Sequence, residues 1–142
     1  MSWTILIVDD SHAARTQLRA PLEAKGATVI EAENGREGLW RARQKTLDLV
    51  IVDIHMPFMD GITMIRELRQ LPGYETTPIF VLTADATSAR IEEGRKAGAN
   101  AWMLKPAQPE LLWKSIEKAL FRKPASTAQP QDRVAGDKAG ER

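Results

Sequence analysis

The segment Leu49-Val50-Ile51-Val52-Asp53 limits the folds open to this chain more than any other part of the sequence. A short apolar run bounded by turn residues is typical of a strand buried on both faces, as in a parallel sheet with helices on either side. Asp53 is then the residue at the carboxyl end of that strand. Ligands of open α/β sheets bind outside the carboxyl ends of the strands, so Asp53 is predicted to face a pocket and not the core.

Five apolar runs alternate with five helical patterns along the chain. The predicted strands cover residues 3–8, 27–32, 48–53, 78–83 and 101–104, and the predicted helices begin near residues 11, 35, 61, 87 and 109. Strands that alternate with helices form parallel sheets with right-handed crossovers and helices on both faces. Five such units favour one α/β domain, a flavodoxin-like, doubly wound sheet of strand order 2-1-3-4-5.

Two of the predicted helices carry further expectations. Asp10 or Ser11 is expected to cap the first helix, and Pro21 should kink it or end it early because proline removes one hydrogen bond and clashes with the preceding turn. In the second helix, Leu39, Trp40 and Ala42 are expected on the inner side.

Composition excludes several classes of function. At 142 residues the chain fits one domain, and the absence of cysteine excludes disulfides, thiol catalysis and thiolate metal sites. Residues 1–122 hold 16 basic and 16 acidic residues, which argues against nucleic-acid binding through a basic surface. Since no signal peptide is recognisable and no apolar run approaches the ~20 residues that span a membrane, we expect a soluble, cytoplasmic protein.

Residues 123–142 differ in composition from the rest of the chain. They are rich in Ala, Pro, Gly, Gln and charged residues, and Val134 is their only large apolar side chain. Such a segment cannot bury enough apolar surface to order itself, so it is predicted to be a disordered tail. A partner-binding segment or an artificial addition also fits this composition.

Polar residues stand where four of the five predicted strands end: Asp9-Asp10, Asp53, Thr83 and Lys105. Three carboxylates within a few ångströms cannot all stay ionised without a cation, and an all-oxygen site suits Mg²⁺. A metal, an ammonium group and a hydroxyl group together would stabilise a phosphoryl group in transfer, with a carboxylate available as the nucleophile.

The chain resembles the receiver domains of bacterial two-component response regulators. The resemblance covers about residues 4–121 and depends on a set of motifs that occur in order: Asp9-Asp10-Ser11, Asp53, Met56-Pro57, Met59-Asp60-Gly61, Thr83-Ala84, Gly98-Ala99 and Lys105-Pro106. It implies a receiver domain over residues 1–122, most similar to stand-alone chemotaxis regulators. Because the predicted strand order is also that of the chemotaxis members, it is not independent of the resemblance.

The resemblance implies a role for each site residue. Asp53 would accept a phosphoryl group from the phosphohistidine of a sensor histidine kinase or phosphotransfer protein. Asp10, Asp53 and the backbone carbonyl of His55 would ligate Mg²⁺, with Asp9 acting mainly through water. The phosphoryl-binding and switch residues would be Thr83, Ala84, Lys105 and Trp102, with Trp102 turning inward behind Thr83. Lys105-Pro106 is expected to be a cis peptide.

An output surface and a tuning pair also follow from the resemblance. The fourth helix, fifth strand and fifth helix would bind an output protein, such as a flagellar motor component, through a surface that includes Arg90, Glu93, Trp102 and Lys105. Trp113 is a further candidate for this surface, although packing of its helix is the simpler interpretation of this residue. His55 and Asp85 stand at places that tune how fast water attacks the acyl phosphate. The protein is expected to be a monomeric signalling protein and not a turnover enzyme.

Other functions fit the sequence less well. A hydrolase that phosphorylates an aspartate commonly needs a second Asp where His55 stands, and a nucleotide-binding switch or flavin carrier needs a phosphate-binding loop where Asp9-Asp10 stand. The pathway stays open, because a receiver that acts as a phosphate sink, or as an adaptor in a relay or pilus-motility pathway, would carry the same motifs.

Overall fold

The structure, a computed structural model, describes residues 2–121 of the chain. The predicted tail at residues 123–142 lies outside the described residues, so its prediction stays untested. None of the helices in the described part is long and apolar enough to cross a membrane.

The described residues contain one sheet of five parallel strands. The strands are β1 (Thr4–Val8), β2 (Thr28–Ala32), β3 (Leu49–Val52), β4 (Ile79–Thr83) and β5 (Ala101–Leu104). Their order is β2-β1-β3-β4-β5, and each neighbouring pair is parallel. This confirms the predicted flavodoxin-like architecture, and it places the carboxyl ends of all five strands at the same edge of the sheet.

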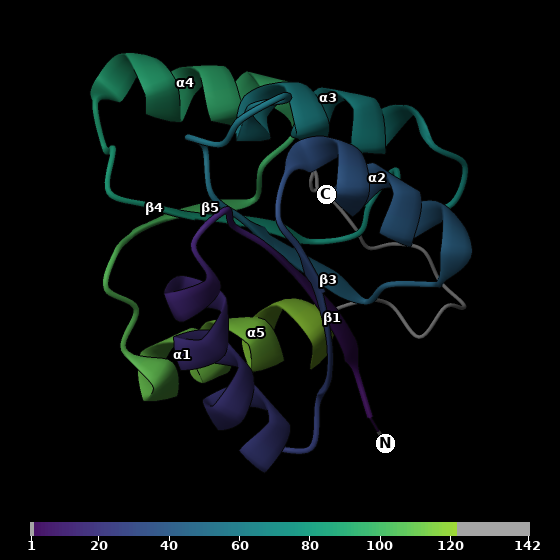
Figure 1. The fold of residues 1–142 in the computed structure, drawn as a ribbon, viewed down its shortest axis with the longest axis vertical. Coiled ribbons are helices and arrows are strands. Elements are labelled where there is room, and N and C mark those ends of the chain that lie inside the picture. The colour runs from purple at the N-terminus through teal and green to yellow at the C-terminus, as the bar shows by residue number, and fades with distance from the viewer. Residues whose placement is uncertain (1, 122–142) are drawn as a thin grey trace.

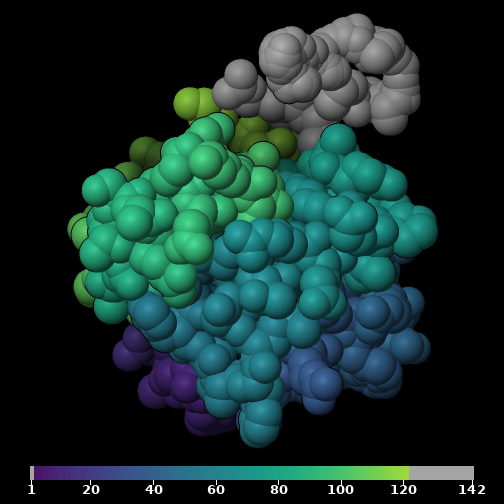
Figure 2. All heavy atoms as spheres, turned by 90° about the horizontal axis from the view of Figure 1, so that it is seen from above, coloured from purple at the N-terminus to yellow at the C-terminus, as the bar shows by residue number. Residues whose placement is uncertain are grey.

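Helices cover both faces of this sheet. The helices are α1 (His12–Ala24), α2 (Gly35–Gln44), α3 (Gly61–Gln70), α4 (Ser88–Ala97) and α5 (Pro109–Phe121). In Figure 1, α1 and α5 lie on one side of the sheet and α2, α3 and α4 on the other. The space-filling view in Figure 2 shows α4, α3 and α2 side by side across this second layer, in green, teal and blue.

The alternation of side chains along the strands produces two hydrophobic cores. Leu6, Val8, Val50 and Val52 point to the side of α2 and α3, whereas Ile5 and Ile7 pack with Leu18 and Leu22 of α1 and with residues of α5. Successive residues of a strand face opposite sides, so a strand between two helical layers must be apolar at every position. All four residues of β3 are buried, as the sequence predicted.

Side-chain caps begin α1, α2 and α3 immediately after the loops that precede them. Ser11 accepts a hydrogen bond from the backbone N–H of Ala14, Asn34 from Glu37 and Asp60 from Thr63. Each cap satisfies a backbone donor that a helix leaves free at its N-terminus. Of the two caps predicted for α1, Ser11 is the one that forms.

Two expectations about the helices differ from the structure in part or in full. α1 continues through Pro21 to Ala24, so the early end does not occur, while the alternative expectation of a kink stays a prediction; Leu18 and Leu22, buried on either side of the proline, hold that turn against the sheet. The expectation that Trp40 lies on the inner side of α2 is wrong. Trp40 is 51% exposed on the outer side of α2. A step of one residue rotates the helix by about 100°, so Leu39 and Ala42 face the sheet, as predicted, while Trp40 turns away.

Arg69 links α3 to the C-terminal end of α4. Its guanidinium donates to the backbone oxygens of Gly98 (2.7 Å), Tyr74 (2.8 Å) and Thr77 (2.7 Å), and to the side-chain oxygen of Asn100 (3.0 Å). Asn100 in turn accepts a hydrogen bond from the backbone N–H of Ile79 at the start of β4. Burial lowers the pKa of Arg69 to about 10, so the group stays cationic at neutral pH.

Replacement of Arg69 by Met is expected to lower the free energy of unfolding by about 3 kcal/mol, because several partly buried oxygens lose a charged donor. Arg66→Met, an exposed substitution on the same helix, is the matched control and should change stability by less than about 0.5 kcal/mol. Urea denaturation followed by circular dichroism measures both. Equal effects of the two substitutions would show that the carbonyl contacts of Arg69 contribute little.

Candidate functional site

The ends of four strands bring the predicted site residues together. Asp9 follows β1, Asp53 follows β3, Thr83 ends β4 and Lys105 follows β5. Backbone hydrogen bonds extend beyond the strands themselves: Asp53 N–H donates to the carbonyl of Val8 (2.9 Å) and Lys105 N–H to the carbonyl of Thr83 (2.9 Å). The backbone of the sheet therefore fixes the relative positions of these residues.

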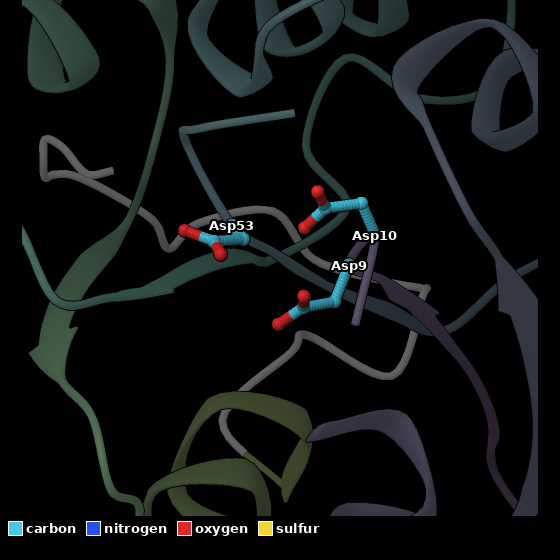
Figure 3. A group of neighbouring side chains, drawn as sticks. All are labelled: Asp9, Asp10 and Asp53. Carbon is cyan, nitrogen blue, oxygen red and sulfur yellow. The ribbon is translucent and has the colours of Figure 1, made fainter. Parts of the chain in front are cut away.

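Three carboxylates gather at this edge. Oxygen atoms of Asp9, Asp10 and Asp53 lie within 4.8 Å of one another, and Figure 3 shows the three side chains projecting into the same space. Asp9 and Asp53 are buried, while Asp10 is exposed. Carboxylates this close repel one another strongly in a partly buried site unless a cation compensates them.

Lys105 compensates part of this charge. Its Nζ lies 2.7 Å from Asp9 Oδ2 and 2.9 Å from Asp53 Oδ2. Burial alone would lower the pKa of Lys105, but the hydrogen bonds and charges of Asp9 and Asp53 outweigh it and raise the pKa. One ammonium group cannot neutralise three carboxylates, so the site keeps a net negative charge. The side-chain atoms that could ligate a metal ion here are all carboxylate oxygens. These residues fit a hard divalent cation such as Mg²⁺.

The loop between β3 and α3 holds the carboxylate of Asp53 in place. The backbone N–H of Ile54 donates to Asp53 Oδ1 at 2.7 Å, so both oxygens of this carboxylate have a donor. Gly61 N–H donates to the carbonyl of Ile54, and a Cβ at Gly61 would overlap the backbone oxygen of Asp53. Only glycine allows α3 to begin this close to the strand.

The same loop contains a residue with strained backbone. Phe58 has φ 70°, although it is not glycine, and its side chain is 84% exposed. The turn around it is closed by a hydrogen bond from Met59 N–H to the carbonyl of Pro57 at 2.8 Å. Backbone strain of this kind persists only where the surrounding structure supports it, and it is often found at functional sites.

His55 and Asp85 form a bridge between two loops of the site. His55 Nε2 lies 2.9 Å from Asp85 Oδ2, so the loop after β3 contacts the loop after β4. The pKa of Asp85 is lowered first by the hydrogen bond from the backbone of Thr87 and then by the bond from His55. Sequence reasoning selected both residues separately; their direct contact appears only in the structure.

Thr83 and Trp102 are connected through Asp85. Thr83 is fully buried, and its hydroxyl oxygen accepts a hydrogen bond from Asp85 N–H at 3.3 Å. Trp102 Nε1 donates to the backbone oxygen of Asp85 at 3.0 Å. Ala84, between Thr83 and Asp85, is exposed. A movement of the Thr83 side chain would therefore shift the backbone of Asp85, to which the indole of Trp102 is hydrogen-bonded.

The indole of Trp102 packs directly on the backbone of α4. A Cβ at Gly94 would overlap Cζ3 of this ring, so the absence of a side chain at position 94 provides the space for it. Trp102 is half-buried and packs against the core shared with α2 and α3. Gly94 was not selected from the sequence, because nothing in an isolated helical pattern shows which glycine faces a large ring.

The other residues predicted for the output surface occupy different surroundings. Arg90 and Glu93 pair with each other on α4 at 2.9 Å. Trp113 of α5 packs against Trp3, with 5.5 Å between ring centroids, which agrees with its interpretation as a packing residue. The Lys105-Pro106 bond is cis, as predicted.

Arg15 is a residue of the site region that sequence reasoning missed. It is buried, and its Nη1 donates to the backbone oxygen of Asp9 at 2.6 Å. A signal for it exists in the sequence, since Arg15, Leu18 and Leu22 share the inner stripe of α1. A charged residue at a position with core spacing indicates a buried polar contact.

Comparison with known proteins gives a consistent family. The sequence profile described as "Response regulator receiver domain" matches residues 5–117. Protein PilH of Pseudomonas aeruginosa is 36% identical over 116 residues, which are 82% of this chain and 96% of that protein. The transcriptional regulatory protein ResD of Bacillus subtilis is 36% identical over 124 residues, 87% of this chain, but the chain spans only 50% of its length.

Solved structures agree with this result. Chemotaxis protein CheY4 of Vibrio cholerae superposes with a TM-score of 0.81 at 34% identity, covering 84% of this chain and 100% of that one. The receiver domain of a sensor histidine kinase from Pseudomonas aeruginosa, whose active-site cleft holds a coordinated magnesium ion, superposes with a TM-score of 0.79 at 26% identity, covering 85% of this chain and 99% of that one.

Replacement of Gly94 by Ala tests the contact with Trp102. In an ordinary exposed helix this change stabilises by about 1 kcal/mol, but here the added methyl group meets the indole and should destabilise by about 2 kcal/mol. Trp102→Phe removes the outer ring, so the double variant should recover much of the loss. Thermal unfolding of the four proteins gives the coupling energy. A stabilised Gly94→Ala protein would show that the ring does not lie on α4.

Proposed function

We propose a specific role for this chain on the premise that it belongs to the response regulator receiver family of two-component signalling, as the profile match over residues 5–117 shows. The chain acts as a stand-alone response regulator that accepts a phosphoryl group from a histidine kinase or phosphotransfer protein onto Asp53. The observation that carries this proposal is the position of Asp53, buried at a strand end with Lys105 Nζ 2.9 Å from its Oδ2. The similarity to nearly the full length of Protein PilH supports a receiver that works without an attached output domain.

The chemistry follows from the positions of the side chains. An oxygen of the Asp53 carboxylate attacks the phosphorus of a phosphohistidine; the new O–P bond forms as the P–N bond breaks, and the imidazole leaves with the electron pair and takes up a proton. Lys105 stabilises negative charge on the phosphoryl oxygens as it develops. Asp10, Asp53 and the carbonyl of His55 would hold Mg²⁺ directly, and Asp9 through water. The bound ion supplies positive charge that lets the phosphoryl group approach three carboxylates.

The switch uses the contacts of Asp85. Thr83 and the adjacent Ala84 bind the phosphoryl group, and the Thr83 hydroxyl then leaves the backbone of Asp85. Because Trp102 Nε1 donates to the carbonyl of Asp85, this movement displaces the indole on α4. The surface formed by α4, β5 and α5 changes as a result and binds an output protein in chemotaxis or motility, such as a flagellar motor component. The similarity to a protein named as a chemotaxis protein, CheY4 of Vibrio cholerae, supports this pathway.

Incubation with Mg²⁺ and acetyl phosphate is expected to add one phosphoryl group to the protein, and Asp53→Asn is expected to abolish the addition. Asp60→Asn, in the same loop, is the matched control: Asp60 caps α3, and asparagine caps helices equally well. Intact-protein mass spectrometry measures the product, and the Trp fluorescence should change only where phosphorylation occurs. Labelling that persists in Asp53→Asn would contradict the assignment of the acceptor.

The bridge between His55 and Asp85 is expected to slow hydrolysis of the acyl phosphate, because it joins the loop that follows Asp53 to the loop that follows β4 and so restrains both loops beside the acceptor. His55→Ala and Asp85→Asn should each raise the rate of phosphate loss about threefold, the range of an exposed ion pair, and the double variant should not exceed either one. Release of phosphate from the purified acyl phosphate measures these rates. Additive effects of the two substitutions would show that the residues act separately.

A further inference from the structure

We propose that Arg15 is a positioning residue for the cation site, an inference that rests on the proposed function. Its hydrogen bond to the backbone of Asp9 orients the two acidic residues after β1 so that both carboxylates face the space shared with Asp53. Arg15 itself donates no hydrogen bond to the carboxylate of Asp9, Asp10 or Asp53. It acts through the backbone that carries Asp9 and Asp10.

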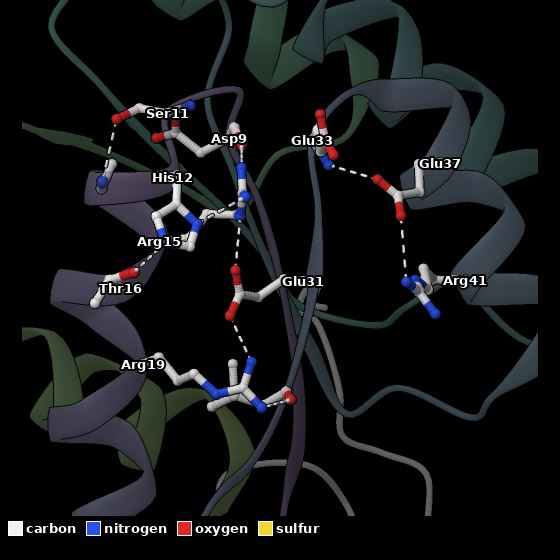
Figure 4. A network of polar contacts seen from close by, with 12 residues as sticks. Asp9, Ser11, His12, Arg15, Thr16, Arg19, Glu31, Glu33, Glu37 and Arg41 are labelled. Atoms are coloured by element: carbon white, nitrogen blue, oxygen red, sulfur yellow. Dashed lines mark hydrogen bonds and ion pairs between the residues drawn. The ribbon is translucent and has the colours of Figure 1, made fainter.

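The contacts of Arg15 come from three directions. Nη1 donates to the carbonyl oxygen of Asp9 at 2.6 Å, Nε donates to Glu31 Oε1 at 2.7 Å, and Nη2 lies 3.4 Å from His12 Nδ1. Figure 4 shows the guanidinium between the end of β1 and the carboxylate of Glu31. The side chain is 10% exposed, so these contacts are shielded from solvent.

The hydrogen bond from Arg15 to the carbonyl of Asp9 restrains Asp10 as well as Asp9. The carbonyl of Asp9 belongs to the peptide unit that joins Asp9 to Asp10, and this unit is planar. Fixing the carbonyl therefore fixes the plane from which both acidic residues project. Asp9 has other restraints, since its N–H donates to Ala32 and its Oδ1 accepts from Ser11 N–H. Within residues 2–121, the carboxylate of exposed Asp10 accepts no hydrogen bond, so its placement depends on this plane.

Glu31 forms an ion pair with Arg15, so the guanidinium charge does not repel a cation bound between the aspartates. An unpaired guanidinium this close would pair with Asp9 itself or repel a divalent cation. Glu31 on β2 instead contacts Arg15 and Arg19. Burial raises the pKa of Glu31, but the hydrogen bonds from Arg15 and Arg19 outweigh this and lower it, so the carboxylate is ionised at neutral pH. Arg15 consequently reaches the loop as a hydrogen-bond donor whose charge is already paired.

A role in positioning and a role as a simple charge predict opposite results. If Arg15 mattered only as a nearby cation, Arg15→Met would strengthen Mg²⁺ binding. Positioning predicts that the same substitution weakens binding about tenfold, as removal of groups that orient metal ligands commonly does. Arg15→Lys keeps the charge, but its single ammonium group cannot reproduce the geometry in which separate nitrogens contact Asp9 and Glu31. It should also weaken binding.

Isothermal titration of the full chain with Mg²⁺, after removal of metal with a chelator, tests the inference. The set is wild type, Arg15→Met, Arg15→Lys and Arg19→Met; the last is the matched control, because it removes the same charge from Glu31 without touching the acidic loop. We expect about tenfold weaker binding in both Arg15 variants and unchanged binding in Arg19→Met. Tighter or unchanged binding in the Arg15 variants, or an equal loss in Arg19→Met, overturns the inference.

A second readout separates positioning from general damage. The rate of phosphorylation by acetyl phosphate should fall in Arg15→Lys at low Mg²⁺ and return to the wild-type rate at saturating Mg²⁺. A rate that stays low at saturation overturns a role through the cation site. Thermal unfolding without Mg²⁺ identifies a folding defect, and Arg15→Lys, the milder change, carries the test if Arg15→Met fails to fold. Wild type that binds no Mg²⁺ overturns the proposed function, and this inference with it.

Discussion

The repulsion among Asp9, Asp10 and Asp53 is the constraint on which the rest of the structure depends. Folding brings these carboxylates within 4.8 Å of one another, which is unfavourable unless positive charge stands beside them. Lys105 provides part of this positive charge from the end of β5, and its contacts with Asp9 and Asp53 link β5 to β1 and β3. The residual negative charge makes the protein receptive to a divalent cation. A site that is unfavourable alone becomes favourable once it is occupied.

Most of the fold and the centre of the site could be predicted because both depend on local sequence patterns. β1, β3, β4 and β5 are mainly apolar, and a polar residue stands where each one ends, so the sequence alone places Asp9, Asp53, Thr83 and Lys105 at one edge. The known strand order of the family contributed to that prediction. Pro21 and Trp40 show where the pattern misleads: packing of Leu18 and Leu22 outweighs the local cost of a proline, and one step around a helix moves a side chain from core to solvent.

The remaining contacts could not be predicted, because they join residues distant in sequence. The spacing of Arg15 signals burial, but only the fold shows that it reaches Asp9 and Glu31. Gly94 and Trp102 are a similar case: the sequence shows a glycine in a helix, but only the fold shows that the indole of Trp102 occupies the space that a side chain at position 94 would need. His55 and Asp85 were selected as individual positions, and the structure adds that they meet. Local chemistry therefore identifies the reactive groups, while the tertiary structure identifies what orients them.

The sparse attachment of α4 has a consequence for motion. Only Gly94 and Ala97 of this helix are buried, so few apolar contacts hold it on the sheet, apart from the indole of Trp102. Elements with few buried contacts open at low free-energy cost, and their backbone amides exchange with solvent sooner than those of the core. α4 should therefore be among the first helices of the described domain to exchange, while β1 and β3 stay protected. A helix held mainly at its C-terminal end, by Arg69, and by the indole of Trp102 can change its position without unfolding the sheet beneath it.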